Sequence, residues 1–205
     1  MVSPSVAASL HLCSDPAETP IGSEPFLIPG AVGVLEAQLD AAKADVRARL
    51  RKPPIAVVCH PHPLHGGALT NKVAHTVAKA FAEMGVTTLR FNFRGVGQSE
   101  GGFDHGIGEV GDLLAAVEWL RARYPEAPLW LAGFSFGAFV ALSAQARAQA
   151  DRLLLVAPPV AMFDFPAEGG VGIPWMVVQG NEDEIVAPAQ VSAWVQQQAN
   201  APEYV

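Results

Sequence analysis

The sequence predicts an α/β protein with a mainly parallel, doubly wound sheet and helices on both faces. The first observation is that short apolar runs alternate with segments of helical periodicity. The apolar runs occupy residues 55–59, 86–93, 128–132, 152–157 and 175–179. The helical patterns occupy residues 71–85, 110–120, 138–150 and 188–198. Such alternation is typical of right-handed βαβ units, and it places ligand sites at the carboxyl ends of the strands.

The second observation is the composition, which suits one sizeable domain. The chain has 205 residues, 50% of them hydrophobic, which is enough to bury a single core. Residues 1–24 are rich in Ser, Pro, Ala and Glu without a period, so we expect a loose N-terminal extension followed by one domain over residues 25–205.

The net charge, the apolar runs and the number of cysteines argue against several classes of protein. The net charge is -7 and the basic residues are scattered, which argues against nucleic acid or an anionic membrane as a partner. No apolar run approaches the roughly 18 residues that a membrane span needs. Cys13 and Cys59 are too few for a disulfide framework. We therefore expect a cytoplasmic protein that binds a small molecule, and the sequence leaves its oligomeric state open.

The first elements lead up to the predicted sheet. Residues 26–39 hold two apolar stretches broken at Pro29 and Gly30, a pattern typical of a hairpin or a pair of edge strands. Residues 41–51 suit a helix or a charged connection. The continuous apolar run at 55–59 predicts a central parallel strand, because such strands are covered on both faces.

The later elements repeat a strand-helix unit. The helix predicted over 71–85 ends at Gly85, which suits the residue after a helix. The strand over 86–93 is followed by a glycine-rich loop over 95–108 and by a helix that Pro125 closes. Residues 203–205 read as the first residues of a further strand.

The most informative motif lies between the strand over 128–132 and the helix over 138–150. It reads Gly133-Phe134-Ser135-Phe136-Gly137. In a nucleophile elbow a serine stands on a strand-to-helix turn so tight that a Cβ on either flanking glycine would clash. We therefore predict that Ser135 is a catalytic nucleophile.

A serine nucleophile needs donors that stabilise an oxyanion. The backbone N–H of Phe136 is the expected first donor, because it lies at a helix N-terminus. The second is expected from the loop after the strand over 55–59, which reads His60-Pro61-His62-Pro63-Leu64-His65-Gly66-Gly67. Since proline has no N–H, His62 is the first choice and Leu64 the second.

The three histidines of that loop also suit a metal site, since imidazole is a common metal ligand. The loop contains two prolines and no acidic residue, and its glycine turn is explained by loop geometry. We therefore expect a structured loop with no metal, and no cofactor elsewhere.

A catalytic acid is expected after the strand over 175–179, where Glu182, Asp183 and Glu184 follow one another. Asp183 is the first choice, since a short carboxylate at a strand end can orient a histidine. The alternative is a solvated acidic turn. Phe134 and Leu64, with the aromatic segment 162–165, are candidates for the substrate pocket. Whether Phe134 and Phe136 line that pocket or pack in the core stays open.

Four motifs together resemble the α/β-hydrolase superfamily. They are the elbow, the histidine-proline loop, Gly180-Asn181-Glu182-Asp183, and Phe91-Asn92-Phe93-Arg94-Gly95-Val96-Gly97-Gln98-Ser99-Glu100-Gly101. More narrowly, residues 26–205 resemble small lidless bacterial serine hydrolases of the esterase and dienelactone-hydrolase-like type. The resemblance implies an acyl hydrolase with the order Ser, Asp, His. It also implies an open site for a small ester or thioester, because only a short connection stands where larger relatives carry a cap.

The sequence departs from this family at its C-terminus. The resemblance places the base histidine after the last strand, and this sequence ends at Val205. We therefore expect the sequence to lack the segment with that histidine, the end of the last strand and a terminal helix, and the 205-residue chain to be nearly inactive. The alternatives are that His105 or a loop histidine is the base, or that the protein is a non-catalytic binding module.

Overall fold

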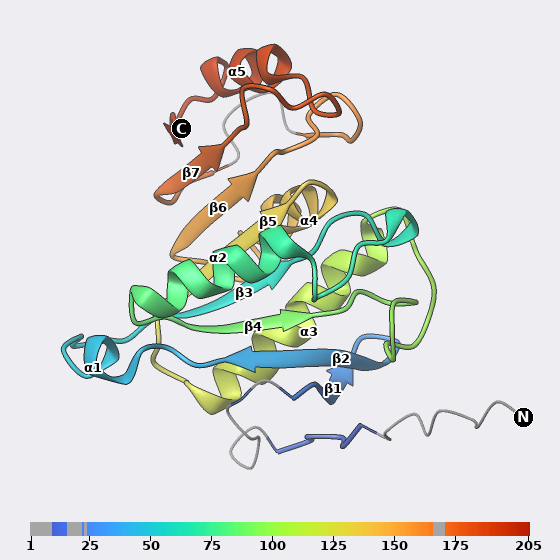
Figure 1. Cartoon of the computed structure of the whole chain (residues 1–205), viewed down its shortest axis with the longest axis vertical. Coiled ribbons are helices and arrows are strands. Elements are labelled where there is room, and N and C mark those ends of the chain that lie inside the picture. The colour runs from blue at the N-terminus through green and yellow to red at the C-terminus, as the bar shows by residue number, and fades with distance from the viewer. Residues whose placement is uncertain (1–9, 16–21, 23, 166–170) are drawn as a thin grey trace, which may run out of the picture.

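The computed structural model describes residues 10–15, 22, 24–165 and 171–205. It contains an eight-stranded sheet in the order β1-β2-β4-β3-β5-β6-β7-β8 (Figure 1). The strands are β1 (Phe26–Gly30), β2 (Gly33–Asp40), β3 (Ile55–Cys59), β4 (Thr87–Phe91), β5 (Leu129–Phe134), β6 (Arg152–Val156), β7 (Trp175–Val178) and β8 (Glu203–Tyr204). β2 pairs antiparallel with β1 and β4, and all other pairs are parallel. The predicted fold class is confirmed.

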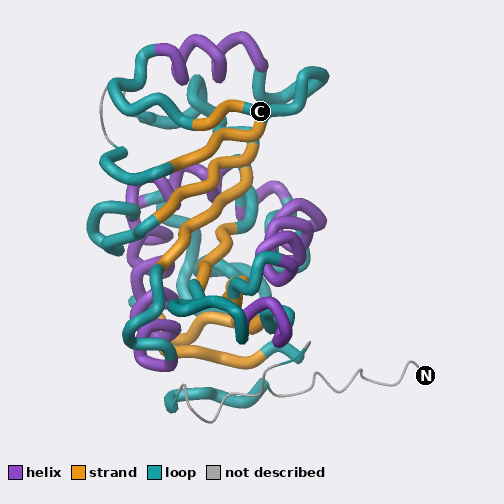
Figure 2. Tube along the Cα trace, turned by 90° about the vertical axis from the view of Figure 1, so that its left-hand side faces the viewer, coloured by secondary structure: helices purple, strands orange, loops and turns teal. Residues whose placement is uncertain are grey.

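Helices cover both faces of the sheet. They are α1 (Ala44–Arg47), α2 (Lys72–Glu83), α3 (Ile107–Arg123), α4 (Phe136–Ala144) and α5 (Pro188–Gln196). α2 lies on one face, and α3 and α4 lie on the other, as the edge-on view shows (Figure 2). The larger core fills the α3 and α4 face, and residues of α5 belong to it. A smaller core lies beneath α2.

The burial of each strand follows its place in the sheet. Every residue of β3 is buried, because helices cover both faces of this central strand. In β2, which lies near the edge, only every second residue is fully buried: Leu35, Ala37 and Leu39. This alternation places one face of β2 on the core.

The ends of α2 are set by residues with capping geometry. The side chain of Asn71 accepts hydrogen bonds from the N–H groups of Val73 at 2.9 Å and Ala74 at 3.3 Å, which satisfies two donors at the helix start. After the helix, Gly85 has φ +82°, a conformation that glycine adopts without a steric penalty. The predicted limits of this helix agree with both residues.

The N-terminal part of the chain differs in detail from the expectation. β1 runs through Pro29 and Gly30 and pairs with β2, so the hairpin turns two residues later than the predicted break. Leu12 forms a parallel bridge to Leu27. The carbonyl oxygen of Cys13 accepts a hydrogen bond from Nε1 of Trp119 at 2.9 Å. These residues of the N-terminal extension therefore pack against the domain.

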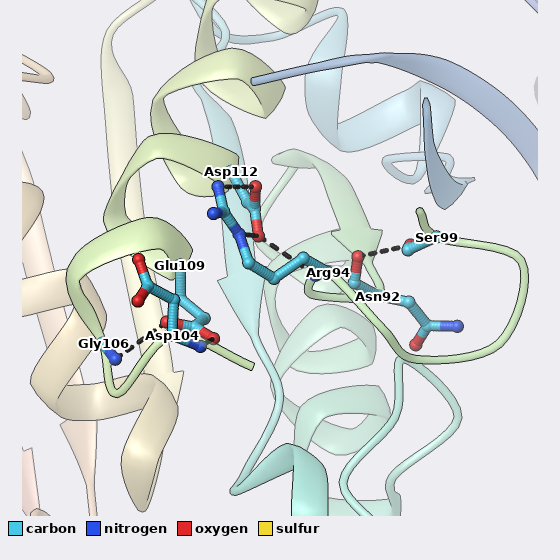
Figure 3. Close-up of polar contacts among 7 residues, drawn as sticks. All are labelled: Asn92, Arg94, Ser99, Asp104, Gly106, Glu109 and Asp112. Atoms are coloured by element: carbon cyan, nitrogen blue, oxygen red, sulfur yellow. Dashed lines mark hydrogen bonds and ion pairs between the residues drawn. The ribbon is translucent and has the colours of Figure 1, made fainter. Parts of the chain in front are cut away.

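Buried polar contacts fix the loop after β4 (Figure 3). The guanidinium of Arg94 donates to Asp112 at 2.9 Å from Nε and 2.7 Å from Nη2, and its backbone N–H donates to the same carboxylate at 3.0 Å. Ser99 Oγ donates to the carbonyl oxygen of Asn92 at 2.7 Å. Since Asp112 lies on α3, these bonds attach the loop to the helix that follows it.

A buried histidine joins the loop after β3 to the end of β4. His60 Nε2 accepts a hydrogen bond from the N–H of Phe93 at 3.1 Å, so the ring proton sits on Nδ1, which lies 2.6 Å from the carbonyl oxygen of Pro61. Burial lowers the pKa of His60 from 6.5 to about 4, because an imidazolium would lose its hydration there. His60 is therefore a neutral structural residue.

We predict that Asp112→Ala destabilises the fold by about 3 to 5 kcal/mol, because it leaves the buried charge of Arg94 without its partner. The free energy of unfolding measured in urea checks this. The matched control is Glu83→Ala, which removes the carboxylate of an exposed ion pair with Lys43 and should leave the urea midpoint unchanged. Equal losses in both variants would contradict the assignment.

We further predict that stability falls as the pH is lowered from about 6.5 to about 4. In this range the unfolded chain binds a proton at residue 60 and the folded chain does not, so acid favours unfolding; the full effect of His60 is about 3 kcal/mol. Urea unfolding at several pH values checks this, with His60→Gln expected to flatten the slope. An NMR titration of the native protein gives a second test, since a His60 pKa near 6.5 would refute it.

Candidate active site

Ser135 alone joins strand β5 to helix α4. Its backbone has φ +54° and ψ -120°, a conformation that L-residues rarely adopt and that costs about 1 to 3 kcal/mol. Its N–H donates to the carbonyl oxygen of Val156 at 2.9 Å. The serine therefore stands on a strained turn at the carboxyl end of β5, beside the end of β6.

The two glycines of the motif are required by close backbone contacts. A Cβ on Gly133 would lie 2.0 Å from the carbonyl oxygen of Gly137. A Cβ on Gly137 would lie 2.5 Å from the carbonyl oxygens of both Cys59 and His60. The start of α4 thus rests directly on the ends of β5 and β3. This is the geometry of a nucleophile elbow, as the motif predicts.

Two backbone N–H groups are available as oxyanion donors. Phe136 is the first residue of α4, so its N–H has no acceptor within the helix. In the loop after β3, the N–H of Leu64 already donates to Nδ1 of His62 at 3.2 Å, which disfavours the second choice. The backbone N–H of His62 donates no hydrogen bond to any described residue. His62 therefore stays the predicted second donor.

Asp183 is the ordered carboxylate of the acidic turn after β7. Its Oδ1 accepts hydrogen bonds from the N–H groups of Ile185 at 2.9 Å and Val186 at 2.8 Å. Its Oδ2 lies 3.4 Å from Nε2 of Gln179, a long contact. The side chain is half-buried, whereas Glu182 and Glu184 are exposed. This order favours Asp183 as the acid that would orient a histidine.

The histidines of the sequence are all described, and none is hydrogen-bonded to Ser135 or Asp183 in the described part of the chain. Since Nδ1 of His62 accepts a hydrogen bond from the N–H of Leu64, its neutral ring carries its proton on Nε2. Burial, followed by the charge of His65, lowers the pKa of His62. His105 is exposed and contacts Phe103 with 4.9 Å between ring centroids.

The metal alternative finds little support in the loop geometry. Both ring nitrogens of His60 are engaged by backbone groups. Across residues 10–15, 22, 24–165 and 171–205, no three His, Cys, Asp or Glu side chains are placed to hold one ion.

The two pocket candidates differ in their surroundings. Leu64 is 68% exposed in a short 3-10 helix, Pro63–His65. Phe134 is half-buried and alternates along β5 with Gly133, so it shares the α2 face with Trp130 and Ala132. Phe136 is fully buried, which settles its packing: its ring belongs to the core.

Sequence reasoning missed two rings near the elbow, Phe103 and Phe139. Their centroids lie 5.7 Å and 6.4 Å from that of Phe136. Phe139 had a detectable signal, since residues three apart share a face of a helix. Phe103 lies in an irregular loop, where spacing carries no such signal.

An apolar groove of about 610 Å³ lies away from Ser135. Its lining includes Met84 of α2, Trp130 of β5, Leu154 of β6 and Met176 of β7. Trp130 and Met176 are each the second residue of their strands. The groove thus opens near the amino ends of the strands, whereas ligands of parallel α/β sheets bind at the carboxyl ends.

The described residues contain no helix that is long and apolar enough to cross a membrane.

Comparison with known proteins agrees with this geometry. A family model described as serine aminopeptidase, S33, matches residues 52–168, more than half of the chain. An uncharacterized protein of Rickettsia prowazekii is 41% identical over 157 residues, which cover 74% of this chain and 66% of that protein. The chain therefore spans slightly less than two thirds of the length of this relative.

Solved structures give the same result. XC6422 from Xanthomonas campestris, an α/β serine hydrolase without a lid, is 44% identical with a TM-score of 0.84, over 91% of this chain and 84% of that one. An α/β serine hydrolase homologue from Coxiella burnetii is 41% identical with a TM-score of 0.82, over 92% of this chain and 88% of that one. The chain therefore belongs to the serine aminopeptidase S33 family, among the lidless α/β serine hydrolases.

Proposed function

We propose that the protein hydrolyses a carboxylic ester or thioester of a small molecule through an acyl-enzyme on Ser135. The observation that carries the proposal is the strained Ser135, held between two glycines that no larger residue can replace. Strained backbone conformations persist only where the surrounding structure imposes them, and they are more frequent at functional sites. The short connection over residues 157–174, where larger relatives carry a cap, favours an open site.

The proposed reaction has two halves. Ser135 Oγ attacks the carbonyl carbon of the ester, its proton passes to a base, and the electron pair of the C=O bond moves onto oxygen. The N–H groups of Phe136 and His62 stabilise that oxyanion. The C–O bond to the alcohol then breaks, and the alcohol leaves with the proton from the base. Water attacks the acyl-enzyme in the same way, which releases the carboxylic acid and restores Ser135.

The base in this scheme is an imidazole that Asp183 orients. The histidines of the printed sequence make no hydrogen bond to Asp183 within the described residues, so the 205-residue chain is proposed to turn over very slowly. Removal of the histidine from a Ser-His-Asp system lowers kcat by about 10⁶. Added imidazole can act as the base, because the residues proposed as nucleophile, oxyanion donors and acid all lie in this chain.

We predict that a fluorophosphonate probe labels Ser135 in the presence of added imidazole, and that mass spectrometry locates the adduct there. Ser135→Ala should abolish labelling. The matched control is Ser143→Ala, which should label as the unchanged protein does. Ser143 is an exposed serine of α4, and its hydroxyl donates a hydrogen bond to the carbonyl oxygen of Phe139. Absence of an adduct at Ser135 would favour a non-catalytic binding module instead.

We predict that imidazole raises Ser135-dependent hydrolysis of p-nitrophenyl acetate by about tenfold or more, a part of the 10² to 10⁴ that a general base contributes. Asp183→Ala should remove most of this increase, because no carboxylate then stabilises the imidazolium. Glu184→Ala, which changes an exposed neighbour, should retain it. Equal increases in both variants would exclude Asp183 from the proposed role.

The same assay distinguishes an esterase from an aminopeptidase. An amino acid p-nitroanilide tested under identical conditions reports amide cleavage. We expect the ester to be hydrolysed and the anilide to be left intact. Faster release of p-nitroaniline than of p-nitrophenol would overturn the ester assignment while leaving Ser135 as the nucleophile.

A further inference from the structure

Five rings contact one another around the first turn of α4, directly after Ser135, and we call them the aromatic cluster. Its members are His62, Phe103, Phe136, Phe139 and Phe163. His62 lies in the loop after β3, Phe103 in the loop after β4, and Phe163 in the loop after β6. Phe136 and Phe139 lie on the first turn of α4, directly after Ser135. The cluster is thus assembled at the carboxyl edge of the sheet, where the nucleophile stands.

Phe136 is the centre of this cluster. The distances from its ring centroid are 5.1 Å to His62, 5.4 Å to Phe163, 5.7 Å to Phe103 and 6.4 Å to Phe139. These separations are typical of interacting aromatic pairs. Phe136 is fully buried, and a further buried ring, Phe93, lies 5.7 Å from it. The exposed part of the cluster is therefore formed by the other four rings.

The outer rings retain exposed surface. His62, Phe103, Phe139 and Phe163 are all half-buried. Their neighbours are mainly further rings: Phe139 stacks on Phe163 at 5.1 Å, and His62 lies 4.8 Å from Phe103. The aromatic ring of a ligand could therefore contact the faces and edges of several of these rings.

The charges around the cluster disfavour an anionic ligand ring. In the described part of the chain, the cations that lie over aromatic rings contact Tyr124 and Trp130, outside the cluster. The acidic residues nearest in sequence to Phe103 and Phe163 are their neighbours Asp104 and Asp164, and both are exposed. Glu109 is fully buried, and both its oxygens accept backbone N–H groups at 2.8 Å. Two exposed carboxylates beside the cluster would repel an anionic ligand.

We propose that the aromatic cluster binds an aromatic ring of the substrate, so that the preferred substrates are aryl or arylalkyl esters without an anionic group. This inference rests on the proposed function of Ser135. It adds Phe103 and Phe163 as residues that determine specificity, because each comes from a different loop and each presents a half-exposed ring beside the elbow. The ring of the ester belongs to either its alcohol or its acyl part, and the test separates the two.

The test measures binding in the Ser135→Ala protein, so that its result does not depend on turnover. Ligand-observed NMR compares phenyl acetate with cyclohexyl acetate, and methyl benzoate with methyl cyclohexanecarboxylate. Within each pair the ligands share one ester group and differ in aromaticity. We expect at least about a tenfold tighter Kd for the aromatic member of one pair, as a few ring contacts would give. The pair that shows it identifies the alcohol or the acyl part.

Variants locate the binding site. In the same Ser135→Ala background, Phe163→Leu and Phe103→Leu keep an apolar side chain but remove a ring, and each should reduce the aromatic preference at least about threefold. Tyr124→Leu is the matched control, since Tyr124 is a half-buried aromatic residue at the end of α3 outside the cluster. It should leave the preference unchanged. Circular dichroism confirms that each variant is folded.

Equal affinities within both pairs, or a preference that survives in both leucine variants, would overturn the inference. The results also distinguish a failure of this inference from a failure of the proposed hydrolase function. A protein that shows the aromatic preference but no fluorophosphonate adduct at Ser135 binds aryl groups without hydrolysing them. A protein that forms the adduct without the preference is a hydrolase of different specificity.

Discussion

The contact on which the site depends is the one between the first turn of α4 and the ends of strands β5 and β3. Gly137 approaches the carbonyl groups of Cys59 and His60 so closely that no side chain fits between them. This contact brings Ser135 and the N-terminus of α4 together with the loop that carries His62. Two parts of the chain that are far apart in sequence thereby meet through a close backbone contact.

Around this contact, buried polar residues hold the loops in register. His60 joins the loop after β3 to the end of β4, and Arg94 attaches the following loop to Asp112 of α3. Each of these groups would be costly to bury alone, and each is satisfied by its partners. The rigidity of the carboxyl edge therefore arises from a few hydrogen-bonded pairs, while the apolar core beneath supplies most of the burial.

Sequence reasoning recovered what depends on local pattern. The buried strand over 55–59, the helix from Asn71 to its end at Gly85, and the elbow all follow from residue order alone, because each is decided within a few residues. The partners of His60, the packing of Cys13 and the rings around Phe136 could not be predicted in this way. These contacts join segments that are far apart in the sequence, and the sequence alone does not show which distant segments lie close together in the fold. For the same reason Asp183 was favoured by its position, while its two backbone donors became known only from the fold.

The backbone of Ser135 has a thermodynamic consequence of its own. Its combination of φ +54° and ψ -120° is unfavourable for any residue with a Cβ, so the fold would tolerate glycine there more easily than serine. Stability alone would therefore select against the residue that this position holds. If Ser135 is the nucleophile proposed above, this position exchanges stability for reactivity.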